Sequence, residues 1–373
     1  MKPIDRTFAQ TLGRIWRRGE SSWLATVLAV DGSAYRHEGA KLIVGQDGQP
    51  VGLISGGCLE GDVALRTLAA GAGSSLLTYD LADEGLFGMG AGCPGTVRIL
   101  LERLEPPKGL LSPLHRFLAD VLADRRAVLA TVVAEDGSGP PKRLYGSEKG
   151  LWVGEAGSWR SACAQVLAEE RPLARAFRGK RGEWVLIDVH APAQELFVFG
   201  AGDDALPLVS LARQLGFRVA VADHRPELLT VRRLAGVRRI DLRRKSGPGG
   251  VIGPGAAVVV MNHHLESDAQ ALSLALESSA AYIALLGPIG RSDRTLKLLA
   301  ESRGPLPAGV RQRIHTPAGL DIGARTPEEV ALSVLSEIVA SRERRPGTSL
   351  SGQRGPLHHP ARPITNSEVE VDE

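Results

Sequence analysis

The sequence has few cysteines, few aromatic residues and no long apolar run. Its 373 residues include three cysteines, at positions 58, 93 and 163, without a CxxC pair, which argues against a disulfide framework and a structural zinc site. No apolar run approaches the roughly 20 residues that span a bilayer. The first residues also lack the apolar core of a secretory signal. We therefore expect a protein of the reducing cytoplasm, without a membrane span.

The charge is nearly balanced, since the formal net charge at pH 7 is only +3. Such a value gives no reason to expect a nucleic acid or an anionic membrane as partner. Hydrophobic residues make up 43% and charged residues 23% of the chain, which is ordinary for globular proteins. The length suggests two or three domains.

The most informative stretch is a glycine turn between a strand pattern at 50–54 and a helix pattern at 62–70. Gly56 and Gly57 precede Cys58 and Glu60 in this turn. Paired glycines let the backbone turn sharply and approach a ligand, and a turn that opens into a helix presents N–H groups and a positive dipole end. This setting favours the thiolate, which is the nucleophile and the metal ligand. A tight turn with a buried cysteine is the alternative, and the sequence leaves both open.

A second glycine-rich loop, at residues 85–95, holds Cys93 and leads into a strand pattern at 96–102. A glycine-rich loop by itself indicates only a flexible connection. Two such loops, each with a cysteine and each joined to a strand, favour a shared site.

Residues 24–33 and 129–138 are similar at a constant offset of 105, with eight of ten positions identical. The second copy lacks a glycine pair, cysteine and glutamate at the corresponding place. We infer two related α+β units, at 1–105 and 106–190, of which the second is a degenerate copy. Chance similarity between two strand-turn segments is the alternative. Cys163, on a helix pattern of the second copy, is expected in the core.

Residues 195–223 match the βαβ pattern of dinucleotide-binding folds. A strand pattern leads into Gly200 and Gly202, a helix pattern follows, and the next strand ends at Asp223. The glycines would admit a phosphate to the helix N-terminus, and Asp223 could accept hydrogen bonds from a ribose. The pattern predicts a Rossmann-like, doubly wound parallel sheet over 191–341, so that the whole chain is of the α/β class.

Binding of NAD(P) or another nucleotide to this unit is left open. Asp203 and Asp204 place two negative charges beside the proposed phosphate site, where they would repel it. Further strands, at 256–261 and 281–286, end in polar loops, the first of which contains His263. In a doubly wound sheet these loops lie at the edge where ligands bind.

Three further segments complete this part of the chain. Thr326 to Glu329 form a capping box that opens the last helix. The arginines between 232 and 244 are expected to form a solvated face, with an anion site as the minority interpretation. Residues 342–373 are rich in Pro, Gly, Ser and Arg and are expected to be disordered.

Several motifs, found in order over about residues 20–340, resemble the XdhC/CoxI family. The N-terminal motifs are Ala34-Tyr35-Arg36, Gly39-Ala40-Lys41, Ser55 to Glu60, and Phe87-Gly88 with Gly92-Cys93. The C-terminal motifs are Phe199 to Gly202, Met261-Asn262-His263, Tyr282 to Gly287 and Gly319 to Glu329. Two residues depart from the pattern. Asp203 replaces the usual histidine and weakens any role inferred for the glycine loop, whereas Pro94 replaces the usual glycine and stiffens the Cys93 loop.

Members of that family are accessory proteins of xanthine dehydrogenase and related molybdenum hydroxylases. The resemblance implies that the chain binds molybdenum cofactor (molybdopterin) and protects it while its terminal sulfido ligand is installed. It also implies delivery to a xanthine dehydrogenase-like apoenzyme, with a cysteine desulfurase as the sulfur donor. The protein would then be a cofactor chaperone rather than a free-standing catalyst, and a homodimer is left open.

The resemblance also implies roles for single residues. Molybdenum favours soft sulfur ligands, so Cys58 or Cys93 would contact the metal or guard its exchangeable ligand. Backbone N–H groups at Gly56 and Gly57 suit the phosphate and the pterin, with Arg36 as a charge-matched partner. Glu60 orients the pterin or holds a proton, or else it only caps the following helix.

Two other functions compete with the accessory role. The first is an NAD(P)-dependent oxidoreductase that binds nicotinamide in the Rossmann cleft, and the second is a regulatory nucleotide sensor. The candidate cofactor-binding residues of the Rossmann unit are Gly200, Gly202, Asp223 and His263, and His263 is expected to be a loop histidine rather than a catalyst. The accessory role is favoured because the two glycine-cysteine loops lie outside the Rossmann unit.

Overall fold

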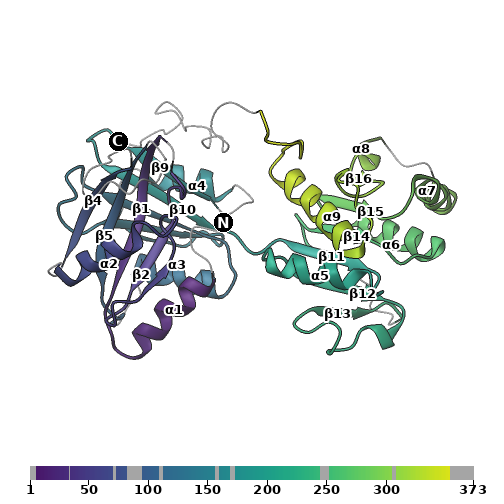
Figure 1. Ribbon diagram of the computed structural model, residues 1–373, viewed down its shortest axis with the longest axis horizontal. Coiled ribbons are helices and arrows are strands. Elements are labelled where there is room, and N and C mark those ends of the chain that lie inside the picture. The colour runs from purple at the N-terminus through teal and green to yellow at the C-terminus, as the bar shows by residue number, and fades with distance from the viewer. Residues whose placement is uncertain are drawn as a thin grey trace. The chain divides into compact units, whose positions relative to one another are not determined.

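The chain folds into two compact units that divide between Pro192 and Ala193. The computed structural model describes residues 6–32, 34–69, 73–81, 95–108, 112–155, 159–168, 173–243, 252–304 and 308–352. We refer to the N-terminal unit and the C-terminal unit, and Figure 1 shows the elements of each.

The N-terminal unit begins with a helix and a five-stranded antiparallel sheet of order β3-β2-β1-β5-β4. Its elements, the first repeat, are α1 (Arg6–Arg17), β1 (Ser22–Gly32), β2 (Lys41–Val44), β3 (Pro50–Gly52), α2 (Glu60–Ala69), β4 (Ser74–Asp80) and β5 (Gly95–Leu104). Gly48, in the hairpin turn between β2 and β3, has a φ of +72°, which explains the glycine there.

The same order of elements then occurs a second time. The second repeat comprises α3 (Pro113–Leu122), β6 (Ala127–Val133), β7 (Lys142–Ser147), β8 (Trp152–Gly154), α4 (Arg160–Leu167), β9 (Leu173–Arg178) and β10 (Trp184–His190). Its sheet has the order β8-β7-β6-β10-β9, in which each strand takes the place of its counterpart in the first sheet. The similar segments of the sequence form the equivalent central strands β1 and β6.

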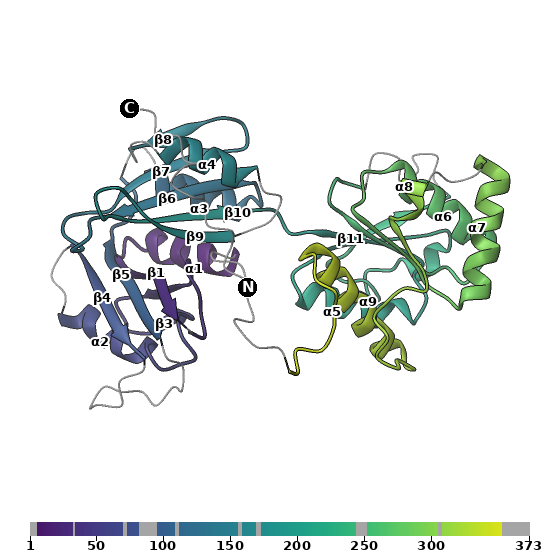
Figure 2. The same ribbon diagram turned by 90° about the horizontal axis from the view of Figure 1, so that it is seen from above.

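The two sheets pack against each other through their inner faces, as Figure 2 shows for the purple-to-blue and teal strands. Leu28 and Leu100 of the first sheet meet Val133 and Leu186 of the second. Helices α1 and α3 share one further core with these inner faces. The outer face of the first sheet is covered by α2 and that of the second by α4.

Two ion pairs cross between the sheets at equivalent positions. Lys41 Nζ lies 2.7 Å from Asp188 Oδ2, and the two side chains are 3% and 2% exposed. Arg143 pairs in the same way with Glu102, with side chains 15% and 5% exposed. The strand registers show that these positions are equivalent. Lys41 lies opposite Thr26, and Arg143 lies opposite the corresponding Thr131. Glu102 lies opposite Leu24, and Asp188 lies opposite the corresponding Leu129. Each repeat therefore gives one cation and one carboxylate to the contact, as in a two-fold symmetric pair.

The C-terminal unit is built on a parallel six-stranded sheet of order β13-β12-β11-β14-β15-β16. Its strands are β11 (Glu195–Phe199), β12 (Arg218–Asp223), β13 (Arg238–Asp241), β14 (Ala257–Val260), β15 (Tyr282–Leu285) and β16 (Ile314–His315). Its helices are α5 (Ala205–Gln214), the 3-10 turn η2 (Pro226–Leu228), α6 (Leu265–Glu277), α7 (Ile289–Arg303), α8 (Ala308–Arg311) and α9 (Pro327–Arg342).

Both faces of this sheet are buried, which explains the unbroken apolar runs of its strands. Leu196 and Val198 of β11 face α5 and α9, whereas Phe197 and Phe199 face α6 and α7. The predicted capping box is present at the start of α9, where Thr326 Oγ1 accepts from the Glu329 N–H and Glu329 Oε2 accepts from the Thr326 N–H.

The predicted fold class is confirmed, since a mixed α/β chain carries the parallel sheet in its C-terminal part. The division into 1–105, 106–190, 191–341 and a tail stays a prediction, and residues 353–373 of that tail lie outside the described residues. No helix among the described residues has the length and apolar character needed to cross a bilayer.

Candidate functional site

The predicted cysteine turn connects β3 to α2 and exposes its thiol. Cys58 is exposed, and Gly57 beside it has a φ of +110°, a conformation that residues with a Cβ rarely adopt. A Cβ on Gly56 would lie 3.7 Å from the ring of Tyr35, which is itself 70% exposed. The turn therefore presents a thiol and bare backbone next to an exposed aromatic ring.

Two buried side chains hold the turn in shape. Glu60 Oε1 accepts from the N–H groups of Ile54 (2.9 Å) and Ser55 (2.8 Å), and Glu60 Oε2 accepts from the Ser55 hydroxyl. Ser55 Oγ in turn accepts from the N–H groups of Gly57 and Leu59. Glu60 is the first residue of α2, yet it reaches back to the residues before the turn, so its observed role is to fix the bend.

The charge of Glu60 depends on these contacts. Burial by itself would raise the pKa of Glu60, but the hydrogen bonds from the Ser55 hydroxyl and from nearby backbone N–H groups outweigh it. The pKa of Glu60 is therefore lower than usual, and the side chain is a carboxylate at neutral pH. Whether Glu60 also orients a pterin stays a prediction.

Some backbone donors of the turn are left for a ligand. Within the described part of the chain, the N–H groups of Gly56 and Cys58 have no hydrogen-bond partner, unlike those of Ser55, Gly57 and Leu59. An anionic group at the turn would therefore find two N–H donors and the N-terminus of α2.

The remaining predicted residues of this site differ in what the structure says of them. Arg36 lies half-buried in the β1–β2 connection, one residue after Tyr35. Cys93 lies outside the described residues. Cys163 is buried under the second sheet, as expected, and burial raises its pKa to about 12. Tyr35 was not predicted as a site residue, although its motif was noted.

The glycine loop of the C-terminal unit follows β11, as the βαβ pattern predicts. Gly200 has a φ of +115°, and a Cβ there would lie 2.6 Å from the carbonyl oxygen of Met261. This glycine is thus needed for close packing of the loop on the neighbouring strand end. Gly202 lies two residues further on, before α5.

Asp223 lies at the end of β12, but its carboxylate is fully buried and already engaged. Oδ2 accepts from the Ala201 N–H (2.7 Å) and from Arg225, and Oδ1 accepts from the N–H and Nε of Arg225. A ribose hydroxyl would have to compete with these donors. The observed role of Asp223 is to tie the glycine loop to the β12 end, and ribose binding stays a prediction.

Each of the two acids after the glycines has a side-chain partner, and the repulsion of a phosphate by these acids stays a prediction. Arg233 lies 2.8 Å from Asp203 and also donates to the Ala201 carbonyl. Asp204 Oδ2 lies 2.6 Å from His263 Nε2. Arg233 is therefore not part of a solvated arginine face, because it turns inward to the glycine loop.

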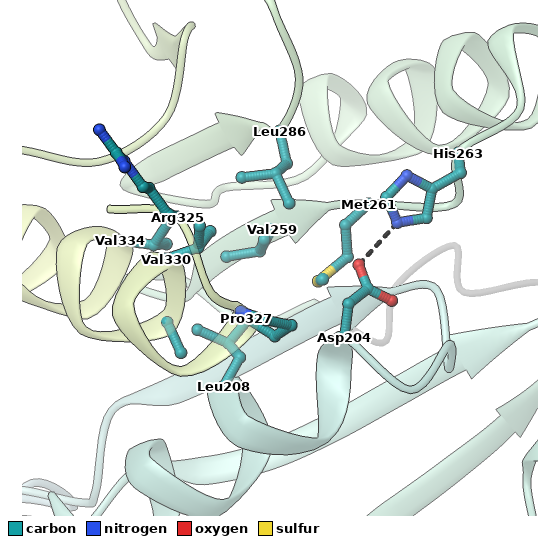
Figure 3. A pocket seen from close by; sticks show the side chains of 11 residues that line it. Asp204, Leu208, Val259, Met261, His263, Leu286, Arg325, Pro327, Val330 and Val334 are labelled. Atoms are coloured by element: carbon teal, nitrogen blue, oxygen red, sulfur yellow. Dashed lines mark hydrogen bonds and ion pairs between the residues drawn. The ribbon is translucent and has the colours of Figure 1, made fainter. Parts of the chain in front are cut away.

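Asp204 and His263 stand at a cavity of about 220 Å³ at the carboxyl edge of the parallel sheet (Figure 3). The cavity lies between α5, α9 and the ends of β14 and β15. Its apolar lining is Leu208, Val259, Met261, Leu286, Val330, Ala331 and Val334, with Pro327 and the exposed Arg325 near its edge. The sequence predicted only His263 among these residues, because the others come from four separate segments.

The described residues contain no group of three or more His, Cys, Asp or Glu side chains that could hold a metal. The structure thus offers two candidate sites, one in each unit: an exposed thiol with free N–H donors, and an apolar cavity with a carboxylate at its mouth.

Comparison with family models gives two matches that together span most of the chain. Residues 15–80 match the model of the XdhC and CoxI family, and residues 196–338 match that of the XdhC Rossmann domain. The first match contains the Cys58 turn, and the second contains the glycine loop and the cavity.

Individual proteins are similar over nearly the whole length. The chain is 32% identical over 334 residues to a Bacillus subtilis (strain 168) protein named as a probable subunit of xanthine dehydrogenase, covering 87% of this chain and 94% of that one. It is 24% identical over 330 residues to the molybdenum cofactor insertion chaperone PaoD of Escherichia coli (strain K12), covering 87% and 84%. A crystal structure described as a xanthine dehydrogenase from Bacillus halodurans superposes with a TM-score of 0.71 at 27% identity, covering 93% and 98%.

Proposed function

The chain belongs to the XdhC and CoxI family, and from this premise we propose that it is an accessory protein of a xanthine dehydrogenase-type molybdenum hydroxylase. In this proposal it binds molybdenum cofactor, holds the cofactor while the terminal sulfido ligand is installed, and delivers it to the apoenzyme. The similarity to a protein named as a molybdenum cofactor insertion chaperone supports a cargo of this kind.

The observation that carries the proposal is the Cys58 turn. The thiol is exposed on a bend whose shape Glu60 fixes, and two neighbouring N–H groups are available to an anion. Molybdenum cofactor brings its own ligands to the metal, so that one soft protein sulfur suffices and a three-ligand metal site is not needed. Its phosphate suits the free N–H donors and the helix end.

We assign the contacts of the cargo to the residues that the sequence predicted. The proposed set is Arg36, Gly56, Gly57, Cys58, Glu60 and Cys93 in the N-terminal unit and Gly200, Gly202, Asp223 and His263 in the C-terminal unit. Cys58 and Cys93 are the proposed thiols near the metal. The sulfido ligand requires a sulfur donor, for which we infer a cysteine desulfurase in the cytoplasm. A homodimer is to be tested by light scattering.

The test begins with protein purified from cells that make molybdenum cofactor. The protein is oxidised, and the fluorescent pterin released is quantified against protein concentration for the wild type, Cys58→Ser, Cys93→Ser and the double variant. Cys163→Ala serves as the control, because that thiol is buried in the core of the second repeat. We expect bound pterin in the wild type and the control, and a clear loss in Cys58→Ser. Equal pterin in all variants would refute the assignment of the site.

Maturation of the hydroxylase and nucleotide binding are measured in parallel. Activation of a xanthine dehydrogenase apoenzyme should fall with Cys58→Ser but not with Cys163→Ala. NADH and NADPH are titrated into the same preparations. Tight binding and turnover of either, without pterin, would replace the proposal with the NAD(P)-dependent oxidoreductase.

A further inference from the structure

We propose that the cavity of the C-terminal unit binds a fused 2-amino-4-oxopyrimidine ring, the ring system that pterins and guanine share. This inference rests on the proposed function only in that the pterin of the cargo is the expected source of the ring. The cavity is lined by α5, β14, β15 and α9, so the site belongs to the C-terminal unit alone.

The position of the cavity is that of a ligand site in a doubly wound sheet. Strand β11 is followed along the chain by β12 on one side, while β14 lies on its other side, so the strand order reverses between β11 and β14. Ligands bind outside the carboxyl ends of the strands at such a point. Val259, Met261 and His263 bring the end of β14 into the lining, and Asp204 brings the start of α5.

The size of the cavity selects a small flat group. At about 220 Å³ it exceeds the roughly 150 Å³ in which an engineered apolar cavity binds benzene. It is smaller than the several hundred Å³ typical of pockets for larger ligands. One fused ring system fits this space, whereas a whole dinucleotide does not.

The apolar lining of the cavity indicates that the bound group has two flat faces that pack against aliphatic side chains. Figure 3 shows Leu208, Val259, Leu286 and Val330 directed at one common space, with Asp204 and His263 at one end. Aliphatic side chains on opposite walls suit the two faces of a planar ring. The polar edge of the ring would then lie at the end that holds the carboxylate.

The carboxylate of Asp204 favours a ring whose edge carries hydrogen-bond donors. Asp204 Oδ2 is bonded to His263 Nε2 at 2.6 Å, which leaves Oδ1 without a partner among the described residues. A carboxylate only accepts hydrogen bonds. Guanine and pterin present two adjacent donors, a ring N–H and the 2-amino group, whereas adenine and cytosine place a ring acceptor beside their amino group. Asp204 therefore favours the first pair, and His263 acts as a positioning residue that orients the carboxylate.

The neighbouring acid provides a matched control. Asp203 is adjacent in sequence, but its side chain is 88% exposed, is paired with Arg233 and does not line the cavity. Asp203→Asn and Asp204→Asn thus remove the same charge from the same loop, and only the second removes an acceptor from the cavity.

The experiment measures quenching and anisotropy of 6-carboxypterin fluorescence with the full chain, with GMP, AMP and NADH as competitors. The acidic pterin is chosen because Arg325 lies at the edge of the cavity. We expect GMP to compete and AMP and NADH not to. Asp204→Asn should weaken binding about tenfold or more, because the charged acceptor of the ring donors is lost, and Asp203→Asn should leave it unchanged. Ala331→Leu, which fills the cavity, should abolish binding while circular dichroism and the melting temperature show a folded protein.

Each outcome decides the inference. Tighter binding of the pterin than of GMP identifies the cargo as the source of the ring, and the reverse identifies a guanine nucleotide. Absence of binding by both, equal competition by AMP, or equal loss in Asp203→Asn would overturn the inference. If co-purified pterin depends on Cys58 but not on Ala331→Leu, and neither 6-carboxypterin nor GMP binds the cavity, the cavity inference fails and the proposed function stands. If GMP binds the cavity and no pterin co-purifies, the proposed function fails and the cavity inference stands.

Discussion

The two repeats of the N-terminal unit share a scaffold and differ in the segment before the second helix. Gly52 and Gly154 occupy equivalent positions, both with positive φ, and a Cβ on either would collide with the carbonyl oxygen of Lys41 or Arg143. Beyond these glycines the repeats diverge. Seven residues (53–59) lead to α2 in the first repeat, and five (155–159) lead to α4 in the second.

This difference distinguishes the features that the fold requires from the Cys58 turn, which it does not require. The inner faces, the glycines at the strand ends and the crossing ion pairs occur in both repeats, so they belong to the scaffold. The Gly-Gly-Cys sequence of the turn occurs in the first repeat only, since residues 155–159 contain neither a glycine pair nor a cysteine. The turn is therefore an addition to the scaffold, which supports a role in binding rather than in folding.

The largest expected difference between the two repeats is the reactivity of their described cysteines, Cys58 and Cys163. Because burial raises the pKa of Cys163 to about 12, only about one thiol in ten thousand is ionised at pH 8, and the thiolate is the reactive form. In a Cys93→Ser background, we expect iodoacetamide to label the exposed Cys58 at least about a thousandfold faster than Cys163. Mass spectrometry after timed pulses measures both rates, and labelling in denaturant, where both should react alike, is the control. Comparable rates in the native protein would show that the second repeat exposes its thiol.

The next largest effect concerns the more deeply buried ion pair. Lys41→Met leaves Asp188 buried without its cation, and we expect a loss of about 3–5 kcal/mol in the free energy of unfolding of the N-terminal unit. The double variant Lys41→Met/Asp188→Leu should recover most of it, since no buried charge remains. Urea denaturation followed by tryptophan fluorescence gives both values, because all five tryptophans, at positions 16, 23, 152, 159 and 184, belong to this unit.

The pH dependence of the Lys41→Met variant provides a second measurement. Burial raises the pKa of Asp188 even with Lys41 present. A carboxyl group with a raised folded-state pKa costs stability as pH rises above its unfolded value of about 3.9. The deficit of Lys41→Met should therefore grow as pH rises through the folded-state pKa. A deficit independent of pH would mean that Asp188 is not its cause.

The other ion pair that crosses between the repeats, Arg143 with Glu102, should give a smaller effect. Arg143 is 15% exposed, compared with 3% for Lys41, so Glu102 retains some access to solvent when its partner is lost. We expect Arg143→Met to cost about 2 kcal/mol in the same denaturation experiment. A cost above that of Lys41→Met would contradict the ranking by burial.

The smallest effect tests whether the turn is an addition to the scaffold. Glu60→Gln replaces a charged acceptor of three hydrogen bonds, and we expect a loss of about 1.5 kcal/mol at pH 7. Because the pKa of Glu60 is lowered, its contribution exists above the unfolded value of about 4.3 and disappears as pH falls through the folded value. As pH falls from about 5 to about 3, the stability of the variant should therefore decrease less than that of the wild type. Glu155→Gln, at an exposed position of the second repeat, is the control and should change stability by less than about 0.5 kcal/mol.

The sequence predicted those features that short segments determine. The βαβ pattern and the capping box at Thr326 each depend on residues close together in the chain. The similarity between residues 24–33 and 129–138 indicated two related units, although it did not show how completely the second repeats the first. The glycine-cysteine turn was found because a glycine pair next to a thiol is visible locally.

The sequence did not predict contacts between distant residues. Lys41 and Asp188 are 147 positions apart, and nothing near either residue indicates the other. Arg233 was assigned to a solvated face because its neighbours are arginines, and only the fold brings it to Asp203. The cavity was missed because its apolar lining looks like ordinary core in every segment that contributes to it.

The crossing ion pairs also bear on the way the chain is made. Lys41 and Glu102 leave the ribosome long before Asp188 and Arg143, with which they pair. A first repeat that closed early would bury a cation and an anion without these partners, at a cost that the finished unit avoids. We therefore expect the nascent N-terminal half to remain open until residue 188 has emerged, which makes translation pauses before that point a time of exposure to chaperones and proteases.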